Sequence, residues 1–72
     1  MKWQAKPESL NPSYFEIKED SSVGFYLYVF ENDKCIYDLL QDTFEIAIES
    51  AWEDYGVPKN AWEKIENDAS RK

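Results

Sequence analysis

Residues 42–58 read DTFEIAIESAWEDYGVP, and this stretch decides the fold because its apolar residues repeat with the period of an α-helix. Intervals of three and four residues place the apolar positions on one side of a helix. Asp42 and Glu45 form a capping-box pattern at its start, and Gly56 followed by Pro58 is a stop signal at its end. The sequence therefore predicts an amphipathic helix over residues 43–55, with a buried face made of Phe44, Ala47, Ile48, Ala51, Trp52 and Tyr55.

Upstream of this helix the sequence is typical of β-strands. Residues 24–30 give the strongest strand signal, because β-branched, aromatic and aliphatic side chains fill a run with turn residues on either side. Weaker strand patterns lie at residues 14–18 and 35–39. The fold class predicted is α+β: a three-stranded antiparallel β-meander, with residues 24–30 as its central strand, packed against one amphipathic helix. Asn60 and Glu63 form a second capping pair, which predicts a short C-terminal helix.

Seventy-two residues are enough for one domain, and twelve aromatic residues can fill the small core that such a chain can bury. Pro7 and Pro12 bracket a polar segment, so we expect residues 1–13 to form an N-terminal arm, pinned by Trp3. Residues 14–66 are expected to form a single compact α+β domain. Residues 67–72 are expected to be a frayed polar tail.

Charge and cysteine content restrict the partners and the compartment. A net charge of −7 argues against direct binding to nucleic acid, which draws its affinity from clustered Lys and Arg. Cys35 is the single cysteine of the chain, so no internal disulfide can form, and this favours a reducing cytoplasm. We expect no membrane attachment, because no run approaches the ~18 apolar residues of a membrane span.

Catalytic chemistry has little support in this composition. The chain has no His, so Cys35 has no imidazole to activate it as a nucleophile. Asp38 and Asp42 lack the surrounding pattern of a calcium loop. We therefore expect no enzyme activity, no catalytic residues, no metal site and no cofactor.

An acidic stripe is the main candidate for function. No Lys or Arg occurs in residues 35–58, and Glu45, Glu49 and Glu53 recur every fourth residue. Like charges at this spacing cost roughly 0.2–0.5 kcal/mol per pair in a helix, so helix stability does not favour them. Two interpretations stay open: a solvated face that keeps the protein in solution, or a surface shaped for a basic partner.

The predicted central strand offers a second candidate surface. Its residues alternate between two faces, and both faces are apolar or aromatic. One helix can cover one face; Trp3 of the arm or Trp62 of the second helix would cover the other. If neither does, Tyr26 and Tyr28 belong to an exposed aromatic face suited to docking or homodimerisation.

Two functions follow from these surfaces. The first is a small acidic cytoplasmic protein that binds a basic protein partner, such as a nuclease or another nucleic-acid-binding protein, with an immunity-type or nucleic-acid-mimicking inhibitor as its specific form. The alternative is a structural or interaction module that dimerises or docks through the aromatic sheet face. The predicted partner-binding residues are Asp38, Asp42, Glu45, Glu49, Glu53, Tyr26 and Tyr28.

Several short motifs carry a resemblance to known proteins. They are residues 38–43 (DLLQDT), alanines 47 and 51, residues 54–58 (DYGVP) and Trp62. Together they resemble a group of small bacterial proteins with a strand, a Gln-Asp-Thr helix start, an aromatic-Gly-Val helix end and a following Trp. The resemblance covers about residues 24–65. It implies the strand and helix and no activity, so no functional residue is carried over.

Overall fold

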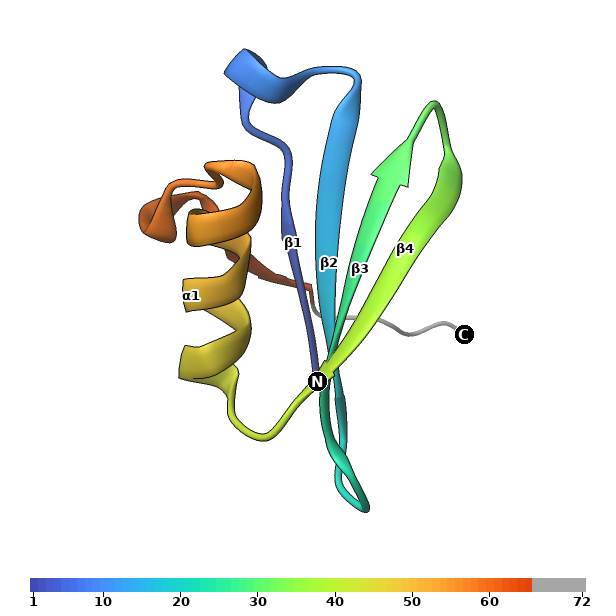
Figure 1. Ribbon diagram of the computed structural model, residues 1–72, viewed down its shortest axis with the longest axis vertical. Coiled ribbons are helices and arrows are strands. Elements are labelled where there is room, and N and C mark those ends of the chain that lie inside the picture. The colour runs from blue at the N-terminus through green and yellow to red at the C-terminus, as the bar shows by residue number, and fades with distance from the viewer. Residues whose placement is uncertain (66–72) are drawn as a thin grey trace.

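The computed structural model describes residues 1–65, which form one antiparallel sheet with one helix packed on it (Figure 1). The helix is α1 (Phe44–Tyr55), and two short 3₁₀ helices, η1 (Glu8–Leu10) and η2 (Lys59–Ala61), lie in the connections. The strands, in the order β4-β3-β2-β1-β5 across the sheet, are β1 (Lys2–Ala5), β2 (Ser13–Asp20), β3 (Gly24–Glu31), β4 (Lys34–Gln41) and β5 (Glu63–Ile65).

The predicted three-stranded meander is wrong, although the α+β class is confirmed. β2, β3 and β4 form the predicted hairpins, but β1 joins β2 and β5 joins β1, so that β2 and not β3 is the middle strand. β1 comes from residues predicted to be part of an arm. It escaped prediction because four residues give too short an alternation to read, although Trp3 and Ala5 do face the core.

The predicted short C-terminal helix is also wrong. The Ala61 N–H donates to the Pro58 carbonyl at 3.0 Å and closes η2, after which Trp62 is extended and leads into β5. β5 pairs with β1, so backbone hydrogen bonds to a distant strand replace those of an isolated short helix, which is marginal in water. The expected tail, residues 67–72, lies outside the described residues.

The boundaries of α1 agree closely with prediction, but its cap does not. The hydroxyl of Thr43, not Asp42, accepts the hydrogen bond of the Ile46 N–H at 3.1 Å. At the other end Gly56 has φ +74°, and its N–H donates to the Trp52 carbonyl at 2.9 Å, which is the bond of an αL C-cap; the Val57 N–H donates to the Ala51 carbonyl at 3.2 Å. This turn buries Val57 completely and so ties the helix end to the core.

The core lies between α1 and one side of the sheet, which we call the inner face. Two small residues, Ala47 and Ala51, face the sheet from α1 and allow close approach. The buried residues are Ala5, Phe15, Ile17, Leu27, Val29, Ala47, Ala51 and Val57. The other side, the outer face, carries the alternate side chains, and Figure 1 shows no helix on it. Within residues 1–65 no helix is both long and apolar enough to cross a bilayer.

Candidate protein-binding surfaces

The predicted site residues fall into two groups on opposite sides of the sheet. Glu45, Glu49 and Glu53 are exposed on α1, with Asp42 exposed just before it. The remaining three lie on the outer face: Asp38 of β4 pairs directly with Tyr28 of β3, and Tyr26 is two residues before Tyr28. The seven residues therefore make two surfaces and not one.

The first surface includes a half-exposed tryptophan. Trp52 was predicted to be buried, yet 49% of it is exposed. At 100° per residue it lies about 140° around the helix from Ala47, at the edge of the apolar stripe and beside the carboxylates. We define the helix surface as Glu45, Glu49, Trp52, Glu53, Pro58 and Lys59.

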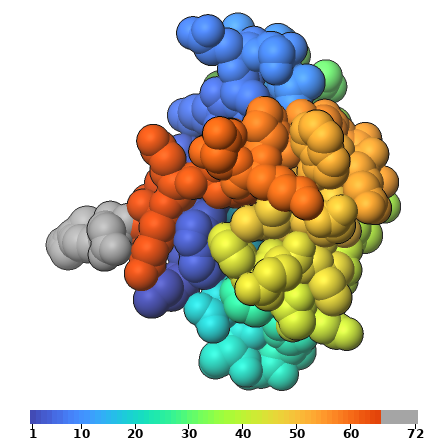
Figure 2. Space-filling model, turned by 90° about the vertical axis from the view of Figure 1, so that its left-hand side faces the viewer, coloured from blue at the N-terminus to red at the C-terminus, as the bar shows by residue number. Residues whose placement is uncertain are grey.

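Two shallow hollows cross the helix surface, which faces the viewer in Figure 2. One, of about 450 Å³, is lined by Trp52, Pro58, Lys59 and Asn60. The other, of about 260 Å³, is lined by Phe44, Glu45, Ile48, Glu49 and Lys59. Lys59 borders both, because η2 folds back against α1. The surface thus combines apolar hollows with carboxylates, which suits a partner with both apolar and cationic side chains.

Lys59 partly neutralises the acidic stripe, which the sequence analysis described as free of cations over residues 35–58. Its Nζ donates to Glu49 Oε1 at 2.8 Å. This hydrogen bond is the main reason why the pKa of Glu49 is lowered, with a hydrogen bond to Glu53 and the charge of Lys59 as further causes. Glu49 is therefore paired within the chain, whereas no ion pair of Glu45 or Glu53 is found among residues 1–65.

The lowered pKa of Glu49 gives a direct test of this ion pair. We expect the Glu49 carboxyl to titrate below its ordinary value of 4.5 in an NMR pH titration, and Lys59→Met to move the midpoint upward. A carboxyl with a lowered folded pKa stabilises the fold above its unfolded pKa, and this contribution is lost as pH falls through the folded value. Lys34→Met, at the start of β4, removes a lysine that has no ion pair with Glu49 and should leave the midpoint unchanged. An unshifted midpoint in the wild type would contradict the pair.

The second surface is the outer face, where four aromatic side chains form a row. Tyr14 stacks on Phe30 with ring centroids 4.8 Å apart and planes 2° apart, and Tyr26 stacks on Tyr28 at 5.9 Å. The Tyr28 and Phe30 rings, 6.4 Å apart, connect the two pairs. We call Tyr14, Phe30, Tyr28 and Tyr26 the aromatic row.

Neither predicted cover lies over the aromatic row. Trp3 packs on the inner face, with its ring 4.3 Å from that of Phe44, and Trp62 packs against the core cluster. Desolvation is the main cause that raises the pKa of Tyr28, followed by the charges of Tyr26 and Asp38. Within residues 1–65, no helix covers the aromatic row, and each of its four side chains is partly exposed.

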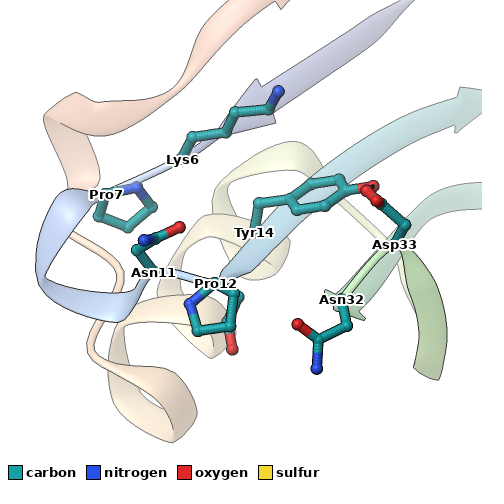
Figure 3. A pocket seen from close by; sticks show the side chains of 8 residues that line it. Lys6, Pro7, Asn11, Pro12, Tyr14, Asn32 and Asp33 are labelled. Atoms are coloured by element: carbon teal, nitrogen blue, oxygen red, sulfur yellow. Dashed lines mark hydrogen bonds between the residues drawn. The ribbon is translucent and has the colours of Figure 1, made fainter.

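A polar pocket of about 310 Å³ at one end of the sheet orients Tyr14 (Figure 3). The Tyr14 hydroxyl donates to Asp33 Oδ1 at 3.3 Å, and Lys6 Nζ lies 5.2 Å from the centre of the Tyr14 ring. Desolvation, followed by the charge of Asp33, raises the pKa of Tyr14. The contacts with Asp33 and Lys6 therefore hold the Tyr14 ring in place at the end of the aromatic row.

Two residues of the helix surface, Lys59 and Trp52, and one neighbour of the aromatic row, Lys18, were not predicted from the sequence. Lys18 of β2 pairs with Tyr26 and is exposed on the outer face. A helical wheel drawn from Ala47 would have placed Trp52 at the edge of the stripe; no sequence signal places Lys59 on Glu49.

Other chemistry is not apparent at either surface. Among residues 1–65, no three His, Cys, Asp or Glu side chains converge on a possible metal site. No family model, curated protein or solved structure matches the chain, so the bacterial resemblance of residues 24–65 stays a prediction.

Proposed function

We propose that this protein binds a basic protein partner through the helix surface. The observation that carries the proposal is the half-exposed Trp52, set among the carboxylates of α1. Trp is enriched at the energetic centres of protein interfaces, and its ring attracts the cationic side chains that carboxylates also attract. A partner that presents Arg or Lys beside apolar residues would therefore contact both the Trp52 ring and the carboxylates.

The spacing of the carboxylates on and next to α1 can be compared with the spacing of phosphates in nucleic acid. Five acids, Asp42, Glu45, Glu49, Glu53 and Asp54, lie in or just before α1; at the rise of a helix they would span about 18 Å, or one charge per about 3.6 Å. Duplex DNA carries one per about 1.7 Å. Carboxylates alone would therefore imitate nucleic acid weakly, and Trp52 has to supply much of the affinity.

The specific form that we propose is an immunity-type or nucleic-acid-mimicking inhibitor of a nuclease or another nucleic-acid-binding protein. Binding rather than catalysis is the activity, in the cytoplasm, where the single Cys35 would stay reduced. Carboxylates complementary to the partner's basic site would speed association and set its orientation.

The test is affinity purification from the native cell, followed by titration of the purified partner. We expect a partner with a basic surface, whose dissociation constant rises about tenfold or more with Trp52→Ala or with Glu45→Lys and Glu53→Lys combined. Lys59→Met should tighten binding, because it frees Glu49 and removes a like charge facing the partner. Binding should weaken as salt rises.

Glu31→Lys and Glu8→Lys are matched controls, since they make the same charge change away from α1 and should alter the affinity by less than about threefold. A partner that is insensitive to salt and to the Trp52 and Glu45/Glu53 changes would overturn the proposal.

A further inference from the structure

We infer that the outer face binds a second copy of this chain in a two-fold symmetric dimer. This surface lies on the opposite side of the sheet from the helix surface, so the inference does not depend on the proposed function. The inference adds an oligomeric state to the proposed function, with a second copy of the chain as the partner of the aromatic row.

The outer face has the apolar content of an interface. Beside the aromatic row, edge strand β4 exposes Leu40 at 46% and Ile36 at 55%. Leu40 pairs with Tyr26 across the sheet, so the apolar surface continues from β3 onto β4. Because the rings are already stacked on a rigid sheet, little side-chain freedom is left to lose on binding.

The distribution of charge favours contact between copies at this face. A net charge of −7 makes two copies repel each other, yet five acids lie in and next to α1 with Lys59 as their counter-charge. On the outer face Lys2 and Lys18 partly offset four acids, Glu16, Asp20, Asp38 and Glu63, and Lys2 Nζ lies 3.8 Å from Glu16 Oε1. Two outer faces can therefore approach with less repulsion than two helix surfaces.

The arrangement of Lys18 and Asp38 is self-complementary. Lys18 of β2 lies beside Tyr26, and Asp38 of β4 lies beside Tyr28, so the two charges flank β3 on opposite sides. A two-fold axis between Tyr26 and Tyr28 would place Lys18 of each copy opposite Asp38 of the other, with the tyrosines interleaved at the centre. Neither Lys18 nor Asp38 has an ion pair within residues 1–65.

The size of the face sets the expected affinity. The five strands hold 31 residues, and at about 3.3 Å by 4.8 Å for each residue they cover about 500 Å² of flat area before the relief of side chains is counted. Specific but transient interfaces bury less than about 1,200 Å² in total. We therefore expect a dimer with a dissociation constant in the micromolar range.

Sedimentation equilibrium on the purified full chain tests the dimer. We expect a monomer–dimer equilibrium at about 1–500 μM protein, and at least about tenfold weaker association for Lys18→Glu or Asp38→Lys, since each variant places like charges together across the axis. Combining Lys18→Glu with Asp38→Lys restores the opposite charges, so we expect the dissociation constant to return to within about threefold of wild type. Tyr28→Ser should give a folded monomer, judged by circular dichroism.

Two variants control for net charge. Lys34→Glu and Glu53→Lys make the same charge changes away from the outer face, and we expect each to keep the dissociation constant within about threefold of wild type. A wild-type monomer at about 500 μM would overturn the inference. A dimer that ignores Tyr28→Ser, or one that the combined charge swap fails to restore, would overturn it as well.

Discussion

Phe15→Ala is expected to destabilise the fold by about 3–5 kcal/mol, the usual cost of removing a buried aromatic ring. Phe15 is 1% exposed on the middle strand, and its ring lies 5.6 Å from that of Tyr55 of α1. A 72-residue chain has about 4–11 kcal/mol of total stability at roughly 0.05–0.15 kcal/mol per residue. The substitution should therefore remove a large part of the stability that keeps α1 on the sheet, and so weaken the geometry of the helix surface.

Urea unfolding followed by circular dichroism measures this effect. The matched control is Tyr37→Ala, which removes an aromatic side chain that is 50% exposed on the edge strand and should cost about 1 kcal/mol. Similar losses for the two variants would show that Phe15 does not carry the core.

Gly24→Ala is expected to cost about 3 kcal/mol or more, for a reason unrelated to apolar burial. Gly24 has φ +136°, and a Cβ there would clash with the carbonyl oxygen of Gln41. That oxygen belongs to the backbone at the end of β4. The Gln41 side chain also donates a hydrogen bond from Nε2 to Ser50 Oγ of α1 at 3.0 Å. A shift at Gln41 would therefore disturb both β4 and the approach to α1.

Gly56→Ala is the control that separates the cost of the positive φ at Gly24 from the cost of the clash with Gln41. Gly56 also has a positive φ, of +74°, but a Cβ there meets nothing within 4 Å, so its cost should be about 1 kcal/mol. Thermal unfolding should therefore give a much larger drop in midpoint for Gly24→Ala. Equal drops would mean that the contact with Gln41 is relieved without cost.

Local sequence signals predicted the elements whose residues are close together in the chain. The limits of α1 and the two hairpins followed from periodicity, glycine and turn residues, which act over a few positions. β1 and β5 were missed because each is short and becomes a strand only by pairing with a distant one. The pattern at Asn60 and Glu63 favours a helix locally, but Glu63 pairs with Gln4 of β1 and lies in a strand instead.

The candidate surfaces were predicted in part for a similar reason. The exposure of Glu45, Glu49 and Glu53 follows from their place opposite the apolar stripe, and the position of the partly exposed Tyr26 and Tyr28 on the outer face follows from strand alternation. Lys59 reaches Glu49 only because the chain turns after Gly56, and Lys18 lies diagonally across β3 from Asp38 only because β2 and β4 flank β3. Such neighbours depend on tertiary structure, so periodicity could not reveal them.

The pairing of β1 with β5 also bears on how the chain folds. It joins Lys2 to Ile65, nearly the two limits of the described chain, and so requires closure of a loop of about sixty residues. Hairpins between neighbouring strands close far shorter loops and lose less chain entropy. The β2-β3-β4 hairpins can thus form early, with the closing strands added last, and contacts of such long sequence separation slow folding relative to a helical protein of similar length.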